Sequence, residues 1–268
     1  STPIVRLLDN FDEIEIVRQD ASSGWEPFDL HCCGPISLPN YLRCLDLIYG
    51  DQTPYMDELN RIYSATAKHP LRAFDKAKSV GFKMRFQPQR DNVWLHRLLK
   101  RPFTYFSIQR FRKNDVFVFV TVRQDIFRWA LSKYHGDGTG KPGHLQFKLA
   151  RGTITRSEIP KIRVDPDAFS EVLEECERLI AQKRRLLERL SRSGVRAAPM
   201  FYESFCDDQA AFFADVMSKL ELPVTQEDIA AALDKGTRFQ KVHSHDISEF
   251  VINADEITER FGDRYVHW

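Results

Sequence analysis

The stretch from Val116 to Tyr134 changes its hydrophobic pattern halfway, and this change constrains the fold more than any other feature of the sequence. Its first half, 116–122, is a run of β-branched and aromatic residues interrupted only by Thr121, which is typical of a strand buried on both faces of a parallel sheet. After Arg123 the apolar residues recur at helical spacing, and Asp125 stands where it can cap the first turn. The stretch therefore predicts a strand that runs into a helix, with Arg123 at the carboxyl end of the strand, where open α/β sheets bind ligands.

Strands and helices alternate through the rest of the chain. We expect further strands within 13–17, 80–86 and 195–205, the last of them ending at Tyr202-Glu203. We expect helices within 1–11, 41–49, 55–67, 92–99, 166–190, 209–220, 226–233 and 254–261. Turn-rich loops are expected over 21–39 and from Gly136 to Gly143, and the charged residues of the helix over 166–190 are expected on a solvated face. This order predicts an α/β fold of three layers, with helices flanking a mainly parallel central sheet, in a single domain over residues 1–268.

Charge and cysteine content narrow the function classes. The formal net charge of +1 gives no overall basic field, so we do not expect nucleic acid as a partner. The five cysteines are Cys32, Cys33, Cys44, Cys176 and Cys206; they form no CxxC pair, which argues against a zinc site and favours a reducing compartment. No apolar run reaches membrane-spanning length and no signal peptide opens the sequence, so we expect a cytoplasmic protein, although an anchor upstream of Ser1 would not be visible here.

The segment from Arg123 to Ser132, RQDIFRWALS, resembles the motif with which sulfotransferases hold the 3′-phosphate of 3′-phosphoadenosine-5′-phosphosulfate (PAPS), the sulfuryl donor. It looks most like the bacterial branch that includes the trehalose and Nod-factor enzymes, where arginine, aspartate, alanine and serine recur at this spacing. A guanidinium offers a planar fork to phosphate oxygens, and a serine hydroxyl adds a further donor. The resemblance implies that Arg123 and Ser132 bind the 3′-phosphate.

Other short matches follow in the order of the family, so the resemblance covers most of the chain and implies a P-loop-like fold. Gly81-Phe82-Lys83-Met84 is similar to the G-x-K-hydrophobic strand of carbohydrate sulfotransferases, and Tyr202-Glu203 is similar to a tyrosine-glutamate pair that ends a later strand. Arg238 and Lys241 occupy the place of the basic loop that closes over the nucleotide. Each match also has a plain interpretation, in which Lys83, Arg238 and Lys241 are solvated charges and Glu203 caps a helix.

The amino-terminal end departs from the family. Members begin with a strand and a loop, R-x-G-[ST]-[ST], that cradles the 5′-phosphosulfate at a helix N-terminus. Ser1 and Thr2 resemble the last residues of that loop and would bind the 5′ side, so we expect the first strand and the rest of the loop upstream of Ser1. Two alternatives stay open: half of the donor site has been lost, or Ser1-Thr2 is a cloning remnant.

Sulfuryl transfer needs a base that takes the proton of the acceptor hydroxyl and positive groups that stabilise the departing nucleotide. Glu26-Pro27-Phe28-Asp29 is similar to the Glu-Pro-x-Glu segment that carries the base in the bacterial branch. The resemblance implies Asp29 as the base, with Glu26 as its competitor and His31 as a third candidate. Lys83 would approach the donor or the acceptor as a further catalytic residue.

The resemblance thus implies a sulfotransferase that moves a sulfuryl group from PAPS to a hydroxyl of a carbohydrate or glycolipid acceptor, and we expect no metal. Two alternatives come from other classes. A P-loop nucleotide or small-molecule kinase would share the sheet, but the chain has no GKS/T lysine. A catalytically silent sulfotransferase-like binding protein would share the fold without the activity. A homodimer is compatible with the sequence, which does not specify the oligomeric state, the acceptor or the position sulfated.

Overall fold

The computed structural model describes residues 2–17, 38–49, 55–64, 73, 78–82, 105–139, 155, 158–235 and 246–267. These residues divide into two compact units. Unit 1 comprises Ser1–Val118, Arg189–Ala197 and Ala214–Gly236, and unit 2 comprises Phe119–Glu188, Ala198–Phe213 and Thr237–Trp268. Each unit is described by itself, and the single-domain arrangement expected from the sequence stays a prediction.

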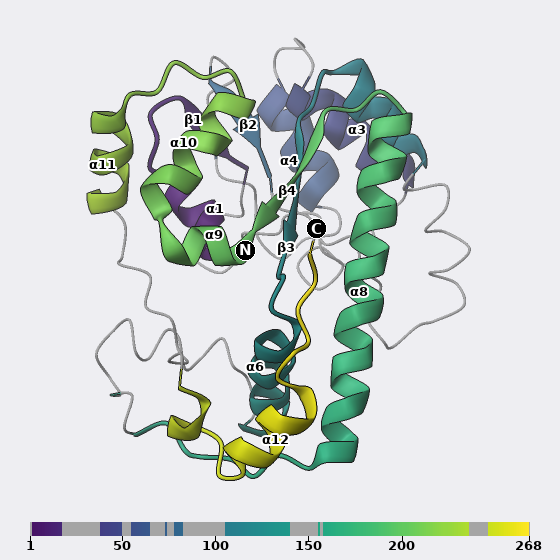
Figure 1. Ribbon diagram of the computed structural model, residues 1–268. Coiled ribbons are helices and arrows are strands. Elements are labelled where there is room, and N and C mark those ends of the chain that lie inside the picture. Colours follow the sequence, from purple (N-terminus) through teal and green to yellow (C-terminus); the bar gives the residue numbers. More distant parts are fainter. Residues whose placement is uncertain are drawn as a thin grey trace. The chain divides into compact units, whose positions relative to one another are not determined.

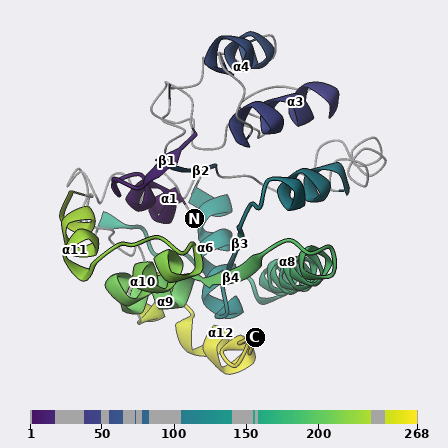
Figure 2. The ribbon, with the colours of Figure 1, turned by 90° about the horizontal axis from the view of Figure 1, so that it is seen from above.

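Unit 1 is mainly helical and contains one small parallel sheet. Its elements are α1 (Thr2–Leu8), β1 (Ile14–Ile16), α3 (Leu38–Tyr49), α4 (Tyr55–Ser64), β2 (Ser79–Gly81), a helix over 105–113 and α11 (Gln226–Lys235). Ile14 pairs with Ser79 and Ile16 with Gly81 in parallel register (Figure 2). A bidentate salt bridge joins α3 and α4: Arg43 donates to the two carboxylate oxygens of Glu58 at 3.0 and 3.2 Å.

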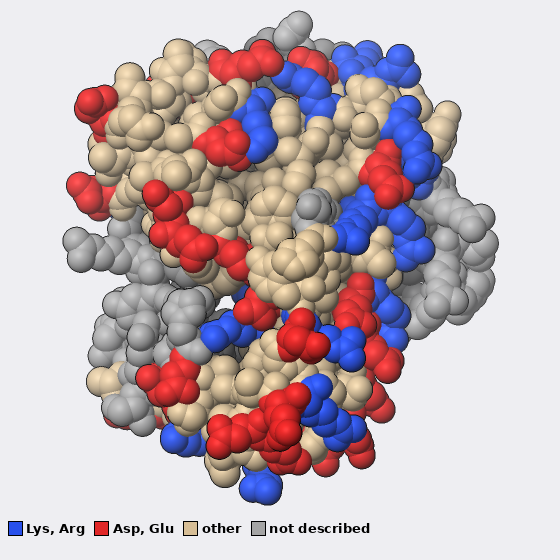
Figure 3. Space-filling model, viewed as in Figure 1, with Lys and Arg blue, Asp and Glu red and all other residues tan. Residues whose placement is uncertain are grey.

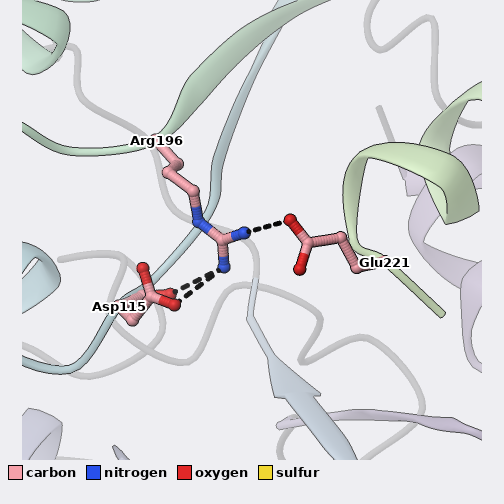
Figure 4. Close-up of polar contacts among 3 residues, drawn as sticks. All are labelled: Asp115, Arg196 and Glu221. Atoms are coloured by element: carbon pink, nitrogen blue, oxygen red, sulfur yellow. Dashed lines mark hydrogen bonds and ion pairs between the residues drawn. The ribbon is translucent and has the colours of Figure 1, made fainter.

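A three-residue ion cluster joins separate segments of unit 1 (Figure 4). Arg196 Nη2 lies 3.0 Å from a carboxylate oxygen of Asp115, and Arg196 Nη1 lies 3.1 Å from Glu221. Asp115 and Glu221 have φ angles of 48° and 58°, a left-handed conformation that costs a residue with a side chain roughly 1–2 kcal/mol. The arginine therefore connects two turns whose backbones are both strained.

Unit 2 contains most of the second pair of strands and the longest helix. Its elements are β3 (Val118–Val122), α6 (Ile126–Thr139), α8 (Pro166–Arg192), β4 (Ala197–Phe201), α9 (Tyr202–Asp207), a short 3₁₀ helix η2 (Ile247–Glu249) and α12 (Ala254–Phe261) (Figure 1). α10 (Gln209–Lys219) follows α9 and passes from unit 2 into unit 1. β3 pairs with β4. Phe169 of α8 is fully buried, and its ring meets those of Phe127, Tyr134 and Phe261 at centroid distances of 5.3–6.0 Å, which joins α6, α8 and α12 in one core.

The mixed α/β class is confirmed, but the described residues form two separate two-stranded sheets and show no continuous three-layer sheet. β3, α8, α10, α11 and α12 lie where the hydrophobic pattern predicts them, and α12 has the predicted bounds. α6 runs to Thr139, into the segment expected as a loop, and 105–113 is a helix that the pattern did not indicate. Part of the strand predicted over 80–86 is present as β2, which ends at Gly81. Phe82 follows it outside the strand, and residues 83–86 lie outside the described residues. None of the helices described has both the length and the apolar character needed to cross a bilayer.

Candidate functional site

The turn between β3 and α6 carries Arg123 and is held by its own capping residue. Asp125 Oδ1 accepts the backbone N–H of Arg128 at 2.8 Å, and Asp125 Oδ2 lies 3.2 Å from Nε of the same arginine. Asp125 is therefore the N-cap of α6, as its place in the sequence predicts. The cap fixes where β3 ends and where α6 begins, and with them the position from which Arg123 extends.

The carboxyl-terminal segment covers this turn. The carbonyl of Arg264 accepts the N–H groups of Ile126 and Phe127 at 3.1 and 3.2 Å, and Val266 donates to the carbonyl of Gln124 at 2.9 Å (Figure 1). The first amides of α6 are thus used within the protein and are not available to an anion. An anion at this place has to be bound by side chains.

The guanidinium of Arg123 lies over an aromatic ring. Its Cζ is 4.0 Å from the ring centroid of Tyr202, the first residue after β4, which is a cation–π distance. No described residue forms a hydrogen bond or an ion pair with Arg123. Burial raises the pKa of the Tyr202 phenol, so the phenol stays neutral even at pH values above its ordinary pKa. The tyrosine ring therefore holds the guanidinium at the end of β3, where its N–H groups have no acceptor among the described residues.

Glu203 connects the same two segments through the backbone. Its Oε1 accepts the N–H of Asp125 at 3.2 Å, so the residue beside Tyr202 holds the residue that caps α6. The other oxygen, Oε2, is buried and has no hydrogen-bond partner in the part of the chain that the structure describes. Tyr202 therefore contacts the side chain of Arg123, and Glu203 binds the main chain of Asp125, so both residues hold the turn between β3 and α6.

Lys183 of α8 adds a second positive charge. Its Nζ donates to the carbonyl of Thr121 at 2.7 Å and lies 5.1 Å from the ring centroid of Trp129. Both views of the ribbon show α8 running beside β3 (Figures 1 and 2). Burial, together with the charge of Arg123, lowers the pKa of Lys183 to about 8. The protein therefore disfavours the charged form of Lys183, and a bound anion would favour it.

Most other cations around this turn have carboxylate partners. Lys133 lies 2.6 Å from Glu175, and Arg264 lies 3.1 Å from Glu177. Arg128 is paired with Asp125, as described above. Lys and Arg are interspersed with Asp and Glu on the face that Figure 3 shows, which matches the small net charge. Arg123 and Lys183 differ in having no carboxylate partner among the described residues.

The structure describes only part of the predicted site. Arg123 lies next to Tyr202-Glu203. The resemblance had matched these two segments separately. Ser132 lies half-exposed in the second turn of α6, and no described side chain binds it. Thr2 begins α1, but its side chain lies outside the described residues, as do Ser1, Glu26, Asp29, His31, Lys83, Arg238 and Lys241. The roles predicted for these residues stay predictions.

Lys183 is the residue that the sequence analysis missed, because it assigned the charges of this helix to a solvated face. The apolar stripe of α8 includes Leu179, Ile180 and Leu187, and position 183 continues it at the i+3 and i+4 spacing. A lysine within an apolar stripe is the signal that could have identified it. The assignment to a solvated face is wrong for Lys183, which is half-buried against β3 and α6.

Two other features of the described residues lie apart from this cluster. A cavity of about 350 Å³ at the start of α12 is lined by Lys161, Ser248, Val251, Ile252, Asn253, Ala254, Asp255 and Glu256, none of which is a predicted site residue. Within the described ranges, no group of three or more His, Cys, Asp or Glu side chains is arranged to hold a metal ion. Among the described residues Cys44, Cys176 and Cys206 are not in disulfide bonds, and burial raises the pKa of Cys176 to about 11.

Comparisons of the chain with protein-family models, with curated proteins and with solved structures gave no significant match. A functional assignment therefore depends on the residues of the Arg123 turn and on their geometry.

Proposed function

We propose that the protein is a sulfotransferase that transfers a sulfuryl group from PAPS to a hydroxyl of a carbohydrate or glycolipid. The observation that carries the proposal is the arginine of the R-x-D-x-x-x-x-A-x-S segment lying on the ring of Tyr202, without an acceptor among the described residues. A planar donor with free N–H groups suits the oxygens of a phosphate monoester. In this proposal Arg123 and Ser132 bind the 3′-phosphate of the donor.

The remaining roles follow the resemblance. Ser1 and Thr2 would bind the 5′ side, and Arg238 and Lys241 would close over the nucleotide. Asp29 would take the acceptor proton, with Glu26 as its competitor, and Lys83 would approach the reacting groups. The proposal includes the three-layer P-loop-like fold of the family, in which β3 and β4 would be neighbouring strands of the central sheet, and a cytoplasmic location.

The test is titration calorimetry with two nucleotides that differ only in the 3′-phosphate, 3′-phosphoadenosine-5′-phosphate (PAP) and adenosine 5′-monophosphate. We expect PAP to bind more tightly. Arg123→Ala should weaken PAP binding by about ten- to hundredfold, the value of lost hydrogen bonds to a charged group, and should leave the weaker nucleotide unaffected. Arg185→Ala, which removes an exposed arginine of α8, is the matched control.

Each other class gives a different result. Transfer of phosphate from ATP in the presence of magnesium, without discrimination for the 3′-phosphate, would identify a kinase. PAP binding without any sulfuryl transfer to a panel of sugars and glycolipids would identify a silent binding protein. Absence of PAP binding, or equal affinity of the wild type and Arg123→Ala, would refute the proposed site.

A further inference from the structure

Lys183 contacts both elements that carry the residues proposed to hold the 3′-phosphate. Its Nζ donates to the carbonyl of Thr121, two positions before Arg123 on the same strand. The same Nζ is 5.1 Å from the ring centroid of Trp129, which shares a face of α6 with Ser132 at the i+3 position. A single ammonium group is therefore adjacent to the strand that ends at Arg123 and to the helix face that carries Ser132.

The contacts of Lys183 leave part of its capacity unused. An ammonium group has three donors, and one of them is used by Thr121. No carboxylate in the described part of the chain pairs with Lys183, although Glu175, on the same helix as Lys183, pairs with Lys133 of α6 at 2.6 Å. A half-buried ammonium near an arginine is unfavourable unless an anion compensates both charges.

We propose that Lys183 is a third binding residue of this site and donates to the same phosphate group as Arg123 and Ser132. The inference rests on the proposed function and adds a specific residue to it. Lys183 supplies the second positive charge that a phosphate dianion requires, because Arg123 alone compensates only one. The alternative is a structural lysine that fastens α8 to β3 through Thr121.

The pH dependence of binding separates these two roles. The pKa of Lys183 is lowered to about 8 by burial and by Arg123, so the free protein loses this charge in mildly alkaline solution. The groups that face Lys183 are Arg123 and the thiol of Cys176, whose own pKa is raised to about 11 by burial, and Cys176 in turn faces the Lys133–Glu175 pair. The Cys176 thiol titrates above this range, so it should not reproduce a loss of positive charge just above pH 8. A phosphate monoester is already a dianion there.

The experiment is titration calorimetry of PAP against the whole chain at pH 7.5 and pH 9.5. The variants are Lys183→Met, Lys183→Arg and the exposed control Arg185→Met. We expect wild-type affinity to fall between the two pH values. Lys183→Met should bind about tenfold more weakly at pH 7.5 and change little with pH, because it lacks the titrating charge. Lys183→Arg should retain affinity at both pH values, since a guanidinium stays charged.

The outcomes distinguish this inference from the function on which it rests. If the wild type does not bind PAP, the proposed function fails. If the wild type binds PAP, but Lys183→Met binds equally well with the same pH profile, only the role of Lys183 is refuted. Circular dichroism of each variant shows whether the fold is retained. Weaker binding by Lys183→Met that Lys183→Arg does not restore at pH 9.5 would also overturn the inference, because a charge is then not what matters.

Discussion

Replacing Asp125 with alanine tests whether the turn that carries Arg123 is stabilised as described. The variant loses the hydrogen bond from the Arg128 N–H at 2.8 Å and the ion pair with Arg128 Nε at 3.2 Å. The lost N-cap costs about 1 kcal/mol, and a partly exposed ion pair adds about 0–1 kcal/mol. We therefore expect the free energy of unfolding to fall by about 1–2 kcal/mol. Urea denaturation followed by circular dichroism measures this difference.

Asparagine at the same position separates the two contributions. Because asparagine caps a helix about as well as aspartate, Asp125→Asn should keep most of the cap and lose only the ion pair, at a cost below about 1 kcal/mol. Asp165→Ala is a matched control, since Asp165 Oδ1 accepts the N–H groups of Asp167 and Ala168 at 3.0 and 2.9 Å and caps α8 in the same way. Equal losses for Asp125→Ala and Asp125→Asn, or no loss for either, would refute this account of the turn.

Three further changes test other parts of the structure. Gly194 has a φ of 71°, and a Cβ added there would make only an ordinary contact with Arg112 at 3.7 Å, so Gly194→Ala should cost about 1 kcal/mol in urea denaturation through its backbone conformation, whereas Gly81→Ala, without a positive φ, should cost less. Arg196→Met removes the exposed ion pairs of Figure 4 and should cost at most about 1 kcal/mol, a loss that should shrink in high salt. The folded-state pKa of Lys183 is lowered to about 8, so between pH 8 and its ordinary value the unfolded chain binds more protons and stability rises with pH. Unfolding free energies measured over this pH window should therefore rise more steeply for the wild type than for Lys183→Met, and parallel curves would contradict the shift.

Local pattern was sufficient wherever an element has a long apolar stripe and clear ends. α8 begins at Pro166 and is followed by Gly194 in the left-handed conformation, as the proline and glycine signals indicate. β3 was also predicted, but only Val120 and Val122 on one face are buried, whereas Phe119 and Thr121 on the other face are half-buried. The expectation of burial on both faces was wrong because a continuous apolar run does not show what packs on each side of a strand.

Local pattern was insufficient where contacts between distant segments decide the structure. The Gly136–Thr139 segment was expected to be a loop, since glycine weakens helices, yet α6 continues through it. The C-terminal segment is another example, because the pairing of Val266 with Gln124 depends on a meeting of distant parts that no short-range signal records. The same holds for the placement of Tyr202 under Arg123, which the sequence could suggest only as the order of two motifs.

Unpaired charge is the strongest structural argument that the Arg123 turn is a binding site. Burying a charge costs free energy, and a protein that needs only stability pairs it or replaces it with an apolar residue. Near this turn the half-buried Lys133 and Arg128 follow that rule, each within 3.2 Å of a carboxylate. Arg123 and Lys183 do not follow it within the described ranges, although Lys183 lies in the apolar stripe of α8. A fold that keeps two such cations beside each other forgoes stability, and binding of an anion would compensate for it.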